Sequence, residues 1–120
     1  MDYRIRAVLV LVWLGFASTS WAQVAPDPGR KVFDGQHCSR CHALAGKGNK
    51  LRPLDDIGLR LDAAKIRAAV TASAPVRPSL PARALVAKQK FAALPAAELD
   101  ALITFLAAQK TKPVVPAKPK

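Results

Sequence analysis

The stretch HCSRCH, residues 37–42, constrains this chain more than any other part of its sequence. It holds both cysteines and both histidines of the protein. Thiolate sulfur and imidazole nitrogen bind metals, and cysteine also forms covalent links to other groups. We therefore expect the rest of the chain to fold around whatever this segment holds.

The N-terminal segment has the pattern of a secretory signal peptide. Arg4 and Arg6 precede an apolar run over residues 7–17, and small residues follow up to Ala22. A bilayer-spanning helix needs roughly 20 apolar residues, so this run predicts cleavage after Ala22 and no stable membrane insertion. We expect a signal peptide over residues 1–22 and a protein exported to the periplasm. The 120-residue chain has room for one modest domain.

The chain is strongly basic, with 19 Lys and Arg against 8 Asp and Glu. A charge of this size steers acidic partners toward the protein. Residues 111–120 are rich in Lys and Pro and predict a flexible tail. Nucleic acid is not expected as a partner, because the sequence has neither Gly-rich RNA-contact segments nor a basic recognition helix with aromatic residues.

Residues 23–110 show helical patterns and no alternation of apolar and polar residues. Asp27 and Pro28 predict the start of a first helix that runs into Cys38. Gly29 and Phe33 fall on one side of this helix, one turn apart. A small and an aromatic residue so placed predict a close crossing with a second helix.

Further along the chain, Asp62 predicts the start of another helix with Ile66 on its inner face. The three prolines at 75, 78 and 81 predict a connecting loop. A last helix is expected to begin at Pro95 and to bury Leu102. The predicted fold is therefore an all-α domain over residues 23–110, with three to four short helices and long loops.

The expected core is small for a domain of this size. Short, alanine-rich helices bury little apolar area, and so few ordered residues struggle to offset their chain entropy. We therefore expect another group to fill the centre of the fold.

Three chemistries compete for HCSRCH. A zinc site is disfavoured, because four tetrahedral ligands do not converge easily from six consecutive residues. A redox disulfide between Cys38 and Cys41 would need a strand before the motif, which the sequence does not predict. A structural disulfide across so short a loop would be strained. The third chemistry is covalent haem, with the two thiols joined to the porphyrin vinyl groups and His42 bound to the iron.

The chain resembles the small bacterial class I cytochromes c, over roughly residues 27–110. The resemblance rests on Gly29 and Phe33 before CSRCH, on the segment RPLDDIGLRL, and on a terminal helix with Leu102 and Phe105. It implies a cytochrome c-like fold around one covalent haem c.

By this resemblance Cys38 and Cys41 would hold the haem and His42 would bind its iron. The carbonyl of Pro53 would accept a hydrogen bond from the other ring nitrogen of His42, which fixes the ring in place. His37 is expected to be a surface histidine, since it cannot reach the far side of a haem attached at the next residue.

One departure from the family pattern concerns the far side of the iron. The family commonly places a methionine there, but the only methionine of this chain is Met1, in the predicted signal peptide. The matching stretch AKQKFAALPAAEL instead places Lys88 at that position, with Lys90 as its neighbour. A neutral lysine amine can bind iron once burial and the metal lower its pKa. The alternative is an open or water-filled sixth position.

These features predict an electron carrier, with acidic redox proteins as partners, acting as a monomer or as a small subunit of a larger redox complex. The alternative is a haem-based protein that binds or senses small ligands at an open sixth site. No separate catalytic site is expected, because Asp55 and Asp56 lie in a loop and Asp62 is predicted as a helix cap.

Overall fold

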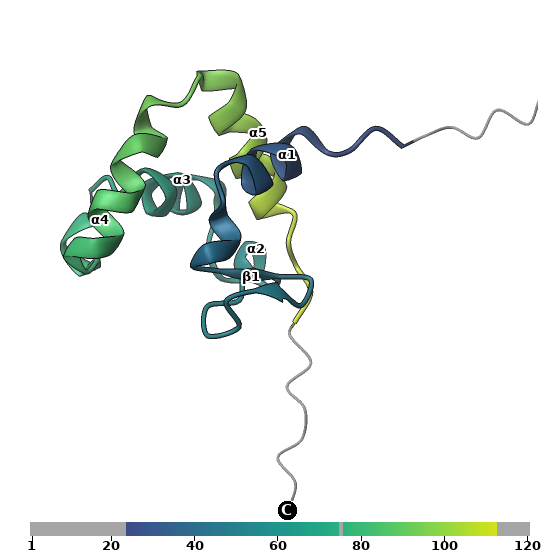
Figure 1. Ribbon diagram of the computed structural model, residues 1–120, viewed down its shortest axis with the longest axis horizontal. Coiled ribbons are helices and arrows are strands. Elements are labelled where there is room, and N and C mark those ends of the chain that lie inside the picture. Colours follow the sequence, from purple (N-terminus) through teal and green to yellow (C-terminus); the bar gives the residue numbers. More distant parts are fainter. Residues whose placement is uncertain (1–23, 75, 113–120) are drawn as a thin grey trace, which may run out of the picture.

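The computed structural model describes residues 24–74 and 76–112 (Figure 1). The expected signal peptide lies outside the described residues, as do residues 113–120 of the expected tail. In chain order the elements are α1 (Pro28–Gly35), η1 (Cys38–Arg40), β1 (Ala43–Leu44), β2 (Lys47–Gly48), α2 (Ile57–Arg60), α3 (Ala63–Thr71), η2 (Arg77–Ser79), α4 (Ala82–Gln89), η3 (Lys90–Ala93) and α5 (Ala96–Ala107), where η marks a 3-10 turn.

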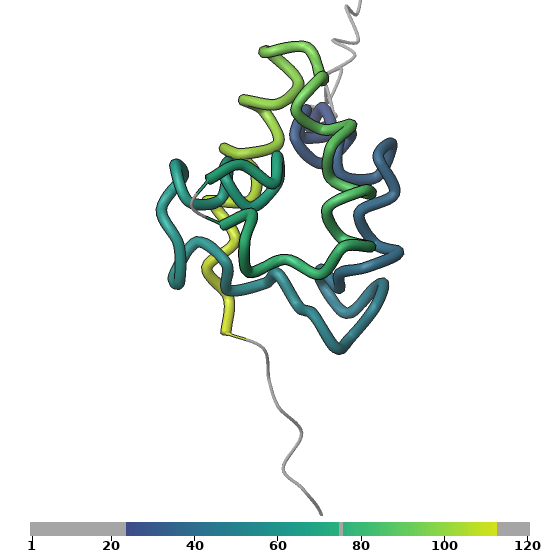
Figure 2. Tube along the Cα trace, turned by 90° about the vertical axis from the view of Figure 1, so that its left-hand side faces the viewer, coloured from purple at the N-terminus to yellow at the C-terminus, as the bar shows by residue number. Residues whose placement is uncertain are grey.

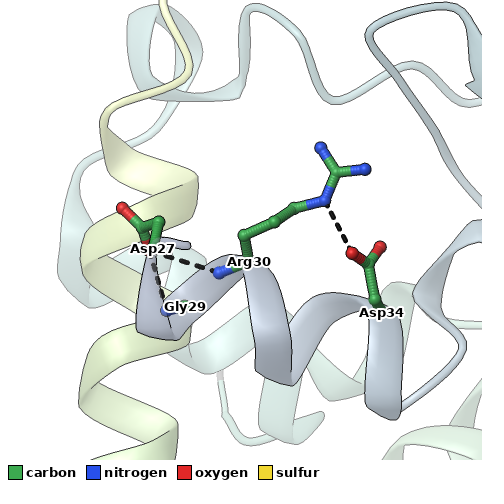
Figure 3. Close-up of polar contacts among 4 residues, drawn as sticks. All are labelled: Asp27, Gly29, Arg30 and Asp34. Atoms are coloured by element: carbon green, nitrogen blue, oxygen red, sulfur yellow. Dashed lines mark hydrogen bonds and ion pairs between the residues drawn. The ribbon is translucent and has the colours of Figure 1, made fainter. Parts of the chain in front are cut away.

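Helix α1 begins as the sequence predicts and ends earlier. The Asp27 carboxylate accepts hydrogen bonds from the backbone N–H groups of Gly29, at 2.7 Å, and Arg30, at 3.2 Å (Figure 3). This caps two amides that have no partner within the helix. The helix stops at Gly35 rather than running into Cys38, because His37 adopts a left-handed backbone conformation with φ of 55°.

Helices α1 and α5 cross at close range (Figure 1). A Cβ atom added at Gly29 would overlap the carbonyl oxygen of Ala101 and the Cβ of Phe105, so only glycine allows this approach. One turn later, the rings of Phe33 and Phe105 pack with their centroids 6.1 Å apart. The predicted crossing of a small and an aromatic residue with a second helix is therefore confirmed.

The core lies where α1, α3 and α5 meet. Asp62 caps α3 by accepting a hydrogen bond from Lys65 N at 2.8 Å, as predicted. The buried apolar side chains form one cluster: Phe33, Leu44, Ile57, Ile66, Leu99, Leu102, Ile103 and Leu106. The all-α prediction is confirmed, and α2 and α4 join the three helices that the sequence patterns predict.

Helix α4 differs from the other long helices, because it has no buried residue. It follows the proline-rich segment and lies to the side of the α1–α5 crossing (Figure 1). A helix in a globular domain is usually held by an apolar face packed on the core. Among the described residues α4 contributes no side chain to the buried core.

The segment after the HCSRCH motif is tied down at both ends. Strands β1 and β2 form a short antiparallel hairpin, in which Ala43 pairs with Gly48. Beyond it, Gly58 N donates to Gln109 O and Thr111 N donates to Asp55 O, each at 2.8 Å. The chain that follows α5 therefore fastens residues 55–58 to the rest of the domain. In the described ranges no helix is long and apolar enough to cross a membrane.

Candidate functional site

A cavity of about 910 Å³ lies between η1, α3 and α4, with α1 and α5 at its base. Figure 2 shows the chain winding around the region that contains it. This volume is near the upper end of the range for pockets that bind small molecules and cofactors. Phe33, Leu102 and Leu106 of the core form part of its lining. The sequence predicted that another group fills the centre of the fold, and this cavity is the space for such a group.

The HCSRCH motif forms one wall of the cavity. Cys38 opens the 3-10 turn η1, and its carbonyl accepts from Cys41 N at 3.2 Å and from His42 N at 3.0 Å. This turn brings the two thiols and the imidazole onto the cavity lining together. Cys38 is half-buried and Cys41 is exposed, and neither forms a disulfide. His37 is exposed but also contributes to the lining.

The ring of His42 is oriented by a backbone carbonyl, although not the expected one. Its Nδ1 lies 3.3 Å from the carbonyl oxygen of Arg52, whereas Pro53 was the expected acceptor. Residues 52–54 run extended beside Ala43, which donates to Arg52 O and accepts from Leu54 N. Successive carbonyls of an extended chain point in opposite directions.

The carbonyl of Pro53 therefore turns away from His42 and accepts from Arg60 at 3.3 Å instead. The expected hydrogen bond is thus displaced by one residue along the chain. Pro53 itself still lines the cavity, beside the imidazole wall.

The surroundings of His42 favour the neutral imidazole, which is the form that binds metals. Burial lowers the pKa of its imidazole, and the nearby positive charge of Lys88 lowers this pKa further, while the Arg52 carbonyl opposes the shift. With Nδ1 donating to that carbonyl, Nε2 carries the free lone pair. A neutral, oriented imidazole is the usual form of a histidine ligand.

The environment of Cys38 does not suit thiol–disulfide exchange. Burial raises the pKa of its thiol to about 11, although Lys88 and Lys90 act in the opposite direction. Redox-active cysteines instead have lowered pKa values and exposed thiolates. The motif follows α1 rather than a strand, so the context of a thioredoxin-like site is also lacking. The redox-disulfide interpretation is therefore not supported.

A purely protein metal site is not supported either. Across residues 24–74 and 76–112, no three or more His, Cys, Asp or Glu side chains gather in an arrangement that could hold a metal ion. The motif thus offers two thiols for attachment and one imidazole for coordination, which is the donor set of a covalently bound haem rather than of zinc.

Lys88 lies on the α4 side of the same cavity. Its Nζ donates to the carbonyl oxygen of Ala69, on α3, at 2.6 Å. Burial lowers the pKa of the Lys88 amine, while the two cysteines of the motif raise it. Lys90 also contributes to the lining, but it is exposed, and its Nζ lies 5.1 Å from the centre of the Phe91 ring.

The cavity lining is positively charged. It contains six basic residues and, within the described residues, no Asp or Glu: Arg40, Arg52, Arg60, Arg83, Lys88 and Lys90. Arg60 is already engaged with Asp56, at 3.0 Å. Lys47 and Lys50 lie in the hairpin region and do not line the cavity.

Two features of this site were missed from the sequence. One is Arg83, which enters the lining only because α4 forms. The other is α4 itself, although a signal for it exists: Leu80, Ala84, Ala87, Lys88 and Phe91 recur at helical spacing, and all five line the cavity. The prolines before this stretch concealed the pattern.

The residues present fit a haem. Two thiols and a neutral imidazole share one wall, an amine lies on the α4 side, and the base of the cavity is apolar. The family model for cytochrome c matches residues 26–110. No curated protein and no solved structure matches the chain. With its fold, its CxxCH motif and this match in agreement, the chain belongs to the cytochrome c family, and its cofactor is a covalently bound haem c.

Proposed function

We propose that this protein is a periplasmic electron carrier, in which Cys38 and Cys41 attach the haem, His42 binds the iron and Lys88 is the sixth ligand. One observation carries the proposal: a single cavity joins the CxxCH wall to a half-buried lysine amine. The haem supplies a one-electron ferric–ferrous couple. The signal-peptide pattern of residues 1–22 supports the location.

On the His42 side, the protein itself supplies the group that orients the ring. The Arg52 carbonyl engages Nδ1, and His42 is half-buried. Because the carbonyl belongs to a segment bridged to Ala43, next to His42, the ring and its acceptor move as one unit. Such partners of a histidine ligand raise its basicity and set its orientation.

The Lys88 side supports amine coordination. A lysine binds a metal only after losing a proton, which costs about 4 to 5 kcal/mol at neutral pH from the reference pKa. Burial of Lys88 shifts its pKa in the direction that reduces this cost. Because an amine is a harder ligand than a thioether, the proposal includes a lower midpoint potential than that of a methionine-ligated relative.

The basic lining supports acidic redox proteins as partners. Five of its six basic members are exposed, so their charge reaches the solvent around the cavity mouth: Arg40, Arg52, Arg60, Arg83 and Lys90. Charge complementarity of this kind mainly raises the rate of association. Association with an acidic partner is therefore expected to slow as salt rises.

A second candidate function is binding of small ligands at an open sixth position. One contact favours it: Lys88 Nζ donates to the Ala69 carbonyl, which gives the amine a partner within the protein. The segment that matches the family contains no methionine that could bind the iron instead of Lys88. Carbon monoxide distinguishes the two functions, since it binds rapidly to a reduced open site and slowly to a site with a bound lysine.

The test is a potentiometric titration of the purified holoprotein, followed by optical absorption. A carrier gives a reversible one-electron transition, and its electron exchange with an acidic redox protein slows as salt rises. Loss of the haem spectrum during one cycle, or exchange that is independent of salt, would contradict the carrier proposal.

A further inference from the structure

Within the described ranges, the Ala69 carbonyl near the end of α3 has no backbone donor. The N–H groups of Ala72 and Ser73 both donate to the carbonyl of Ala68, one residue earlier. The last carbonyls of a helix need partners from outside it. Lys88 supplies that partner at 2.6 Å, and among the described residues this is the only side-chain hydrogen bond between α3 and α4.

The wall beside Lys88 is built from small apolar groups. Ala84 and Ala87 of α4 and Ala69 and Val70 of α3 line the cavity around it. These side chains carry no donor or acceptor, so they offer a small uncharged molecule space but no hydrogen bond. Lys88 is therefore the polar group of this wall that is able to bind either a carbonyl or a metal.

Helix α4 packs little apolar surface on the protein core, so the protein chain alone leaves Lys88 room to move. No residue of α4 is buried, and Val86 on its outer side is 72% exposed. Elements with little buried apolar surface open at low free-energy cost. The lysine side chain also has four flexible methylene groups, so the amine can change partners without a change of fold.

We propose that Lys88 exchanges between two acceptors, the Ala69 carbonyl and the haem iron, and that this exchange controls access of a small uncharged ligand of the carbon monoxide class to the iron. The inference rests on the proposed haem site and specifies its regulation. When the amine leaves the carbonyl for the metal, its ammonium group releases one proton to water. When it returns to the Ala69 carbonyl, it takes up one proton and frees the iron for the ligand.

The experiment is rapid mixing of the ferrous holoprotein with carbon monoxide, over a range of gas concentrations. The wild-type protein is expected to bind in two phases. One phase accelerates with gas concentration, from molecules with the amine at Ala69, and the other is independent of it, from molecules whose amine must first leave the iron. The Lys88→Ala variant should lose the concentration-independent phase entirely.

Two further variants make the result specific. Lys90→Ala, a lysine two residues away on the same lining, should keep both phases. Ala87→Leu fills the small-residue wall and should slow the concentration-dependent phase several-fold without removing the other one. Nuclear magnetic resonance of the ferrous protein gives a second measure, because the Lys88 methylene signals should show exchange between two environments.

The outcomes separate this inference from the function on which it rests. Identical kinetics in the wild type and Lys88→Ala, or loss of the slow phase in Lys90→Ala, would overturn the role of Lys88. Failure of carbon monoxide to bind to Lys88→Ala would also overturn it, while leaving the attached haem intact. Absence of a haem spectrum in the starting protein would instead contradict the proposed function.

Discussion

At the scale of single residues, Lys88 has the greatest influence on the proposed chemistry. Replacing it with methionine puts a thioether at the position where the family commonly carries one. If Lys88 faces the iron, Lys88→Met should raise the midpoint potential by on the order of 0.1 V, because a thioether favours the ferrous form more than an amine does. A potentiometric titration measures this directly.

Lys90→Met is the matched control for that substitution. Lys90 lines the same cavity, but it is exposed and lies over the Phe91 ring. Its substitution should leave the midpoint close to that of the wild type. Equal potentials in Lys88→Met and the wild type would mean that Lys88 does not face the iron.

Gly29 sets the distance between α1 and α5. Gly29→Ala forces a methyl group into the Ala101 carbonyl and the Phe105 side chain, so it should reduce the free energy of unfolding by about 1 to 3 kcal/mol. Denaturant unfolding of the holoprotein measures the change. Gly35→Ala is the control, because a Cβ there meets no atom within 4 Å, and it should leave stability unchanged or slightly higher.

At the scale of elements, the N-cap of α3 makes a pH-dependent contribution to stability. The backbone N–H of Lys65 is the main cause that lowers the pKa of Asp62. A carboxylate with a lowered folded-state pKa stabilises the protein above its ordinary pKa, and this stabilisation is lost as pH falls through the folded value. Asp62→Asn keeps a capping oxygen but removes the charge.

The difference in melting temperature between wild type and Asp62→Asn should therefore be largest near neutral pH and shrink in acid. Thermal unfolding of both proteins, followed by circular dichroism at several pH values, measures it. A difference that stayed constant from neutral to acidic pH would contradict this origin of the cap's stability.

The elements also show what the sequence can and cannot predict. Asp27, Gly29 and Phe33 act within one helix and one crossing, so local capping and spacing rules were enough to predict them. Helix α4 was missed because the prolines before it concealed the helical spacing of its cavity-lining residues. The Arg52 acceptor was missed by one residue, since carbonyl direction depends on the bridge to Ala43, which only the folded chain reveals.

At the scale of the whole molecule, the helices and loops surround the cofactor cavity. The buried apolar cluster occupies one side, and the cavity of about 910 Å³ separates it from α4. The composition predicted that the apolar core would be too small to stabilise the domain alone. It did not predict where in the fold the cofactor cavity would lie. The placement follows from the α1–α5 crossing together with the ties of residues 55–58 to the chain after α5.

The central claim is that haem is covalently attached to this chain through Cys38 and Cys41. The most direct test is the intact mass and optical spectrum of the mature protein, made in a host that matures c-type cytochromes, with Cys38→Ala and Cys41→Ala beside it. The wild-type protein should be red and heavier than its polypeptide by one haem, which resists acid extraction. The variant in which both cysteines are replaced should lose this stable attachment. A colourless protein at polypeptide mass would contradict it.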